Sequence, residues 1–179
     1  MRSQRPVLRT GLCVCYSLAM SNPDHLFFGL DWEPDSSEPI NFLETRLHDL
    51  SPFSAHEVEL DGVVYKTVEH AYQALRAVPE ARQPISDARS PMDAWRAGQV
   101  AKQTNQLVPD FDKLALMERI FRAKLAQHND VREVLLATGS RELLKVYDTD
   151  YFWGTGADNT GENQMGKLWM KLRTELHSA

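Results

Sequence analysis

The chain has 179 residues, a length typical of one domain with a genuine hydrophobic core. With 42% hydrophobic and 25% charged residues it has the composition of an ordinary globular protein, and no apolar run reaches the roughly 20 residues of a transmembrane helix. The formal net charge of −5 argues against duplex nucleic acid held mainly through its phosphates, but it leaves room for a local basic pocket that binds one phosphorylated small molecule.

The first 20 residues are unusual, because three arginines precede a short apolar stretch. This order is faintly similar to a signal peptide, but it also fits an extension without stable structure. We expect a poorly ordered extension over residues 1–20 and a single domain over residues 21–179. The only cysteines, Cys13 and Cys15, lie in this extension, so we expect no disulfide framework and a cytoplasmic location.

The first predicted elements are a hairpin and two helices. Alternating apolar and polar residues flank Asp61-Gly62, which predicts a β-hairpin. Apolar residues at helical spacing predict a helix over 68–77, with Thr67 as its N-cap. The next helix is expected to have Ser90 as its N-cap and Pro91 at its first position.

The second half of the chain also reads as mainly helical. One amphipathic helix carries an apolar stripe of Phe111, Leu114, Met117, Phe121 and Leu125. A further helix is expected to be capped by Asn129 or Asp130 and to be ended by Gly139. The segment "SRELLKVY" fits a short helix or a strand, and a C-terminal helix is predicted over about 162–177. The expected fold is therefore a mainly helical α+β domain with a small β-hairpin or sheet.

A glycine-rich turn precedes the C-terminal helix. Four of the nine glycines lie in it: Gly154, Gly156, Gly161 and Gly166. The spacing is similar to that of a Walker loop, but Leu168 replaces the hydroxyl residue that holds magnesium, so we do not expect ATPase chemistry. Two interpretations remain: an anion site for phosphate at a helix start, or a tight turn that packs Trp153 into the core.

Four blocks in order, "TVEHAYQAL", "SPMDAWRAG", "AKLAQHNDVREVLLATG" and "DYFWGTGADNTGENQMGKLWMKLR", resemble the motifs of the YbiA-like family, also called NADAR. The resemblance covers roughly residues 41–176. It implies a YbiA-like fold and an N-glycosidase that cleaves a ribosyl C–N bond in phosphorylated ribosyl bases. It implies either riboflavin-pathway aminopyrimidine nucleotides or ADP-ribose attached to guanine as substrate. The negative charge favours the small metabolite.

The resemblance also suggests catalytic residues. Breaking a ribosyl C–N bond builds positive charge at the anomeric carbon, which a nearby carboxylate stabilises. Glu69, in the motif "EHAYQA", is the first candidate, although the helix dipole by itself favours an acidic residue there. Asp150 is the second candidate, as an acid–base partner or a ribose ligand, or simply as a residue that shapes the turn.

The expected substrate-binding residues each have a structural alternative. Trp153 offers an aromatic face for the base, and Phe53 offers the opposite wall, although both also suit a core. Asn163 is expected to bind a ribose or phosphate oxygen or to cap the last helix. Lys124 matches a family position and is expected to neutralise phosphate, unless it is an exposed lysine on an amphipathic helix. The four glycines of the turn are expected to hold the phosphate.

The chain departs from the family pattern at Arg76, where the family commonly has lysine. Arginine still binds phosphate, but it cannot form a Schiff base with a ring-opened ribose. A non-catalytic sensor of NAD or ADP-ribose therefore remains an alternative to the enzyme. His70 and His128 show no metal-ligand spacing such as HExxH, so we expect no metal, and we expect no cofactor.

Overall fold

The computed structural model describes residues 37–43 and 46–178, so the expectations for residues 1–36 lie outside the described residues. The described part contains the helices α1 (Val68–Leu75), α2 (Arg82–Ser86), α3 (Pro91–Gln103), α4 (Lys113–Gln127), α5 (Asn129–Ala137) and α6 (Gln164–Ser178). Two short 3-10 helices, η2 (Arg46–Leu50) and η3 (Pro79–Ala81), accompany them. None of these helices has the length and apolar content that a membrane span requires.

The strands form two small sheets. β1 (Ile40–Asn41) pairs in parallel with β4 (Leu143–Leu144), and β2 (Val58–Leu60) pairs antiparallel with β3 (Val63–Tyr65). Asp61 and Gly62 at the hairpin turn have φ of 53° and 77°, the left-handed values that a tight two-residue turn requires. The predicted hairpin and the mainly helical α+β class are confirmed.

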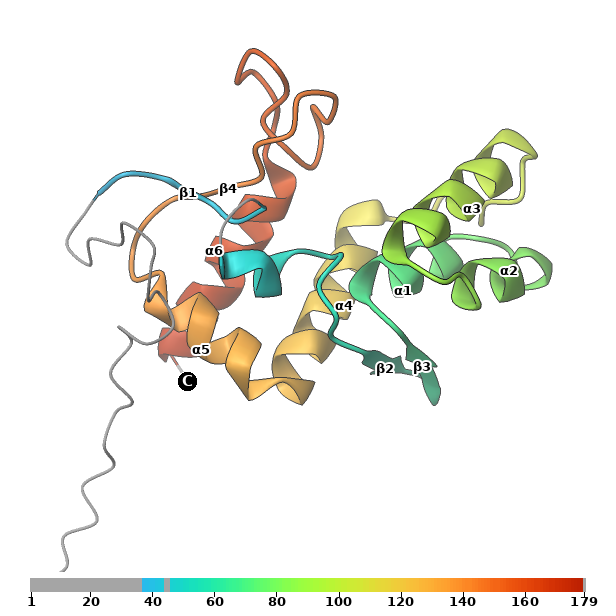
Figure 1. Ribbon diagram of the computed structural model, residues 1–179, viewed down its shortest axis with the longest axis horizontal. Coiled ribbons are helices and arrows are strands. Elements are labelled where there is room, and N and C mark those ends of the chain that lie inside the picture. The colour runs from blue at the N-terminus through green and yellow to red at the C-terminus, as the bar shows by residue number, and fades with distance from the viewer. Residues whose placement is uncertain (1–36, 44–45, 179) are drawn as a thin grey trace, which may run out of the picture.

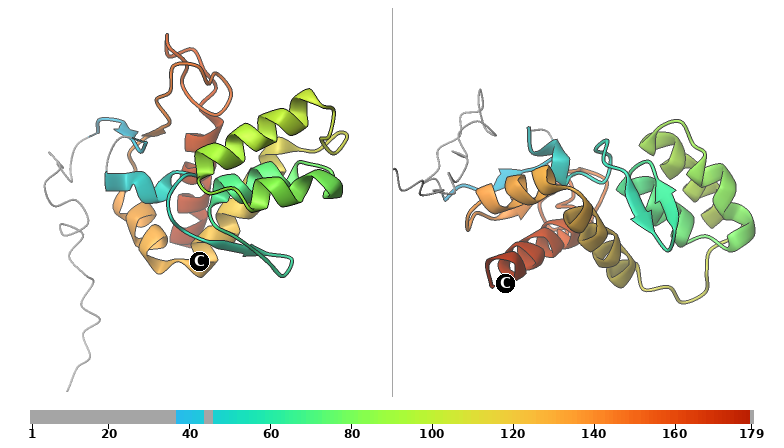
Figure 2. Two further views of the ribbon diagram at one scale, coloured as in Figure 1. Left: turned by 45° about the vertical axis from the view of Figure 1, so that its right-hand side comes forward. Right: turned by 90° about the horizontal axis from the view of Figure 1, so that it is seen from below.

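Helix α4 lies between two groups of elements (Figure 1). α1, α2 and α3 lie to one side of it, and α5, α6 and the β1–β4 pair lie to the other, as the right-hand view of Figure 2 also shows. The long segment from residue 145 to residue 163 extends beyond the start of α6 (orange in Figure 1). The two groups and this segment together make the space in which the site described below is built.

Helix α1 is the centre of one half of the core. Thr67 caps it, since its side chain accepts a hydrogen bond from the amide of His70 at 3.3 Å, as predicted. Seven of its eight residues are buried, including Glu69 and Gln73. A helix covered all round can present polar side chains only to the protein interior or to a cavity.

The other half of the core joins α4 to α6. The rings of Phe121 and Trp169 stack with their centroids 3.9 Å apart, and Nε1 of Trp169 donates to the carbonyl oxygen of Leu50 at 2.9 Å. This contact fixes η2 against both helices. The segment that follows η2, which includes Phe53, is therefore held on a rigid support.

One local expectation differs from the structure, and one open alternative is resolved by it. The N-cap of α5 is His128, whose side chain makes no capping bond, instead of Asn129 or Asp130. Asp130 bonds the amide of its own neighbour, Val131, at 2.9 Å. The segment "SRELLKVY" is a strand at Leu143–Leu144, because it meets β1 from the distant start of the domain.

Candidate active site

A cavity of about 710 Å³ opens between α1, α3, the segment after η2 and the segment after β4. This volume is within the usual range for small-molecule sites. Five of the predicted site residues line it: Phe53, Glu69, Arg76, Asp150 and Trp153. They come from parts of the chain that only the folded domain brings together.

Glu69 is held in the first turn of α1 with its side chain 6% exposed. Its Oε1 accepts a hydrogen bond from Nε2 of Gln73 at 2.7 Å. Burial raises the pKa of this carboxyl, although the Gln73 bond and the charges of Lys145 and Arg76 act in the opposite direction. Glu69 therefore keeps a proton to a higher pH than an ordinary glutamate, which suits a group that gives and takes protons.

Asp150 is fixed by two partners. Its Oδ1 accepts from the amide of Trp153 at 2.9 Å, and its Oδ2 pairs with Nζ of Lys145 at 2.5 Å. The Asp150 charge contributes to the raised pKa of Glu69. The two carboxyl groups therefore share one electrostatic environment, in which Asp150 is the ion-paired one and Glu69 the desolvated one.

Aromatic rings form part of the cavity wall. Trp153 meets the ring of Tyr72 edge to face, with centroids 5.7 Å apart, and meets Phe152 edge to face at 4.8 Å. Phe53 and the half-exposed Trp95 also line the cavity. These surfaces can bind a flat base by stacking.

Positive charge gathers in the same cavity. Arg76, Lys102 and Lys145 line it, against the two carboxyl groups of Glu69 and Asp150. The cavity is therefore locally basic although the chain carries a net charge of −5. A phosphorylated ligand fits this balance.

Arg76 is only partly satisfied by the protein. Its Nη2 donates to the carbonyl oxygen of Gly98 at 3.2 Å, and its guanidinium lies 5.6 Å from the centre of the Tyr72 ring. Among the described residues, Nε of Arg76 and Oε1 of Gln73 are buried polar atoms without a hydrogen-bond partner. Such atoms are uncommon in folded proteins, and here both belong to residues of one cavity.

The glycines of the glycine-rich turn do not line the cavity. The amides of Gln164 and Met165, at the start of α6, donate to the carbonyl oxygens of Phe152 and Trp153. These N–H groups are therefore paired within the protein, so they do not form the open anion site that we expected. None of Gly154, Gly156, Gly161 and Gly166 lines the cavity, and each packs closely against other parts of the chain.

The contacts of these glycines are with backbone and a ring. A Cβ at Gly154 would lie 2.7 Å from the carbonyl oxygen of Lys145, and Cβ atoms at Gly161 and Gly166 would overlap other carbonyl groups. Gly156 has a φ of 68° and packs on the ring of Tyr151. The turn thus supports the segment that carries Asp150 and Trp153.

The side chain of Asn163 makes two hydrogen bonds to the backbone. Its Oδ1 accepts from the amide of Lys145 at 3.0 Å, and its Nδ2 donates to the carbonyl oxygen of Leu143 at 2.9 Å. The side chain therefore ties the start of α6 to β4. This bond holds the backbone of Lys145, whose side chain reaches Asp150.

Lys124 does not line the cavity. It is fully buried, and its Nζ donates to the carbonyl oxygens of Asp49 and Ser51 and, at 2.6 Å, to Oγ of Ser54. Lys124 is therefore neither an exposed lysine on an amphipathic helix nor in a position to contact a phosphate in the cavity. Lys124 instead anchors the segment that leads from η2 past Phe53.

The sequence interpretation missed Lys145, Tyr72, Gln73, Trp95 and Lys102 as cavity residues. A signal for three of them was present. Gln73 lies at helical spacing between Glu69 and the C-cap Arg76 of α1, and Trp95 and Lys102 lie at helical spacing on α3. Lys145 gave no such signal, since it follows a two-residue strand with no pattern of its own.

Gly98 provides a test of how tightly Glu69 is positioned. A Cβ at this position would lie 2.7 Å from Cδ of Gln73, the residue that donates to Glu69. In Gly98→Ala we expect Gln73 to shift and kcat to fall by up to about 100-fold, because small displacements of reacting groups have effects of that size. Val100→Ala, at an exposed position of the same helix, is the control and should leave kcat unchanged. Unaltered kcat in both variants would show that the Gln73 contact does not position Glu69.

The fold and the cavity together define a small α+β domain with a basic, aromatic-walled site that carries two carboxyl groups. The model of the NADAR domain matches residues 37–177. The chain belongs to the NADAR family.

Proteins with similar sequences are named as N-glycosidases or as riboflavin biosynthesis proteins. N-glycosidase YbiA of Escherichia coli (strain K12) is 35% identical over 140 residues, which cover 76% of this chain and 88% of that protein. An N-glycosidase of Nostoc punctiforme is 37% identical over 134 residues, covering 72% and 85% respectively. The riboflavin biosynthesis protein PYRR of Zea mays is 34% identical over 142 residues, which are 70% of this chain and 23% of that protein.

A solved structure supports the fold. The NMR structure of E. coli YbiA aligns with a TM-score of 0.71 and 32% sequence identity, covering 80% of this chain and 87% of that one.

Proposed function

We propose that the chain is an N-glycosidase that hydrolyses the ribosyl C–N bond of a phosphorylated ribosyl base, with riboflavin-pathway aminopyrimidine ribosyl phosphates as its substrates. The observation that carries the proposal is the pair of carboxyl groups in one basic cavity, Glu69 desolvated and Asp150 ion-paired. The names of the similar proteins, an N-glycosidase and a riboflavin biosynthesis protein, support the same reaction and substrate class.

Asp150 and Glu69 have different roles in the proposed reaction. Asp150, in its ion pair with Lys145, stabilises the positive charge that develops at the anomeric carbon. Glu69 exchanges the proton, since its raised pKa favours the protonated form that assists the leaving base. Water adds at the anomeric carbon, so that the products are a ribose phosphate and the free base.

Binding is assigned to the remaining cavity residues. Trp153 and Phe53 lie where they can flank the base, and Arg76 and Lys102 provide positive charge for the phosphate. Lys145 supplies a primary amine in the same cavity. The replacement of a family lysine by Arg76 therefore leaves the site with amines, which favours an enzyme over a silent sensor.

The direct test is the release of ribose phosphate. Purified protein is incubated with the aminopyrimidine ribosyl phosphate and, separately, with DNA that carries ADP-ribose on guanine, and the products are separated by chromatography. We expect ribose 5-phosphate from the first substrate. Release of ADP-ribose from the second substrate alone would assign the other family reaction. Tight binding of ADP-ribose or NAD without turnover of either would identify a sensor and overturn the proposal.

Asp150→Asn tests the charge at the anomeric carbon. The amide keeps an oxygen for the amide of Trp153 but loses the charge that pairs with Lys145. We expect kcat to fall by about 100-fold, a typical loss for one catalytic side chain, with little change in melting temperature. Asp148→Asn is the matched control, an exposed residue of the same segment, and kcat should stay at the wild-type value. Equal kcat in the two variants would remove Asp150 from the mechanism.

A further inference from the structure

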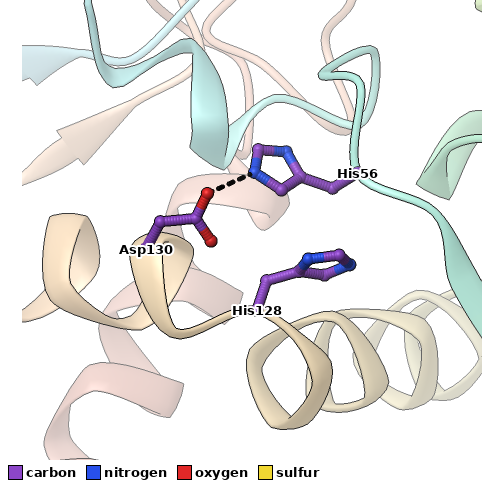
Figure 3. Close-up of side chains that lie close together, drawn as sticks. All are labelled: His56, His128 and Asp130. Atoms are coloured by element: carbon purple, nitrogen blue, oxygen red, sulfur yellow. Dashed lines mark hydrogen bonds and ion pairs between the residues drawn. The ribbon is translucent and has the colours of Figure 1, made fainter.

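A second group of polar side chains lies outside the cavity. His56, His128 and Asp130 each offer one ligand atom, and these atoms all lie within 4.8 Å of one another. Figure 3 shows the three side chains pointing toward one another, His56 from the segment before β2 and the other two from the junction of α4 and α5. The two imidazole rings meet edge to face, with their centroids 4.9 Å apart.

The outer nitrogen of His128 is bound by the backbone. Its Nε2 lies 2.6 Å from the carbonyl oxygen of Glu57. Because a carbonyl oxygen only accepts, Nε2 carries the hydrogen and Nδ1 keeps its lone pair. The nitrogen that remains for a further partner is therefore a base.

The outer nitrogen of His56 also has an oxygen partner, in this case the hydroxyl of a side chain. Its Nδ1 lies 3.0 Å from Oγ of Ser54, whose own hydrogen is directed to the carbonyl oxygen of Ser51 at 2.9 Å. In the tautomer in which Oγ of Ser54 accepts from Nδ1, Nε2 of neutral His56 keeps a lone pair. That lone pair faces Oδ2 of Asp130 at 3.1 Å.

Three electron-pair donors thus face one another: two imidazole nitrogens and a carboxylate oxygen. Such a group requires a positive charge at its centre, either a proton on His56 or a cation. In protein metal sites the outer N–H of each ligating histidine is usually bound to a carbonyl or another oxygen, which fixes the tautomer, and both histidines here have that arrangement.

The geometry points to a binding site for a divalent transition-metal ion of the zinc class at His56, His128 and Asp130. Two imidazole nitrogens and one carboxylate oxygen suit zinc or its neighbours in the series and do not suit magnesium or calcium, which bind through oxygen. Three protein ligands leave the fourth position of a tetrahedral ion to water.

The site has a structural consequence. Ser54 and His56 follow Phe53, which lines the cavity, while His128 and Asp130 belong to the junction of α4 and α5. A bound ion would cross-link this part of the cavity wall to the helices behind it. The ion is therefore expected to stabilise the fold without taking part in the chemistry at Glu69.

Calorimetry with zinc ion alone tests the site. The full chain is used with Cys13→Ser and Cys15→Ser, because thiolates also bind zinc. We expect one zinc ion per chain, and we expect His56→Gln, His128→Gln and Asp130→Asn each to weaken its binding by at least about 10-fold, the smallest loss typical even of an outer-sphere partner. His177→Gln, at an exposed position of α6, is the control and should bind zinc as the parent does.

Melting curves provide a readout that is independent of activity. Zinc should raise the melting temperature of the parent and not that of Asp130→Asn, an exposed position where the substitution leaves the shape of the side chain intact. Magnesium should have no effect on either protein. The inference is overturned by a parent that binds no zinc at micromolar concentration, or by equal binding to the parent and to the three ligand variants.

Discussion

Glu69→Gln is expected to lower kcat by two to four orders of magnitude, the usual contribution of a general acid or base, while substrate binding is retained. The amide is close to the carboxyl in shape and can still accept the hydrogen bond from Nε2 of Gln73. The experiment compares single-turnover rates with binding measured by calorimetry. Retained turnover would remove Glu69 from the chemistry.

The same variant should be more stable than the wild type at neutral pH. Burial raises the pKa of Glu69 in the folded state, so its contribution to stability is present below about pH 4.5 and is lost as the pH rises through the raised pKa. Glutamine has no charge to bury. The melting temperature of Glu69→Gln should therefore exceed that of the wild type at pH 7, and the difference should shrink in acid.

Glu133→Gln is the matched control for both effects. Glu133 is exposed on α5, so its amide variant should change neither kcat nor the pH dependence of melting. An equal gain of stability in both variants would indicate a general effect of net charge. In that case the gain would say nothing about the burial of Glu69.

Lys124→Met is expected to lower the free energy of unfolding by about 2–3 kcal/mol, because it removes three hydrogen bonds to buried oxygens. Nζ of Lys124 reaches the carbonyl oxygens of Asp49 and Ser51 and the hydroxyl of Ser54. Methionine has a similar length and fills the space without these bonds. Denaturant unfolding at a fixed pH measures the difference.

Lys124 also predicts a pH dependence. Burial lowers its pKa from 10.5 to about 7, so between these values unfolding takes up a proton. Relative to Lys124→Met, the wild type should gain up to about 1.4 kcal/mol of stability per pH unit as the pH rises through this window. Lys167→Met, at an exposed position of α6, is the control and should follow the wild-type curve. Parallel curves for the wild type and Lys124→Met would contradict the low pKa.

Local signals in the sequence were sufficient for much of the fold. The hairpin at Asp61-Gly62, the N-cap at Thr67 and the start of α3 at Ser90 each depend on a few neighbouring residues, and all agree with the structure. The pairing of β1 with β4 was not predictable in this way. It joins two-residue strands from opposite ends of the domain, and neither has a periodic pattern.

In the site, too, some features could be predicted from local sequence signals and others could not. The motif around Glu69 marks a residue that does face the cavity, whereas the glycine pattern at 154–166 marks the support of the cavity wall. Glycines allow a ligand or another part of the chain to approach closely, and sequence alone does not distinguish the two. Lys124 had a readable signal, because it lies seven residues after Met117 on the apolar stripe of α4, where an exposed lysine is not expected.

The cavity is built from residues between Leu43 and Met165, almost the whole length of the described domain. A chain that ends before α6 therefore lacks part of the cavity wall. During synthesis the site cannot be completed until α6 has left the ribosome. A nascent or prematurely ended chain thus contains the motif of Glu69 but not the complete enclosure that raises the pKa of its carboxyl.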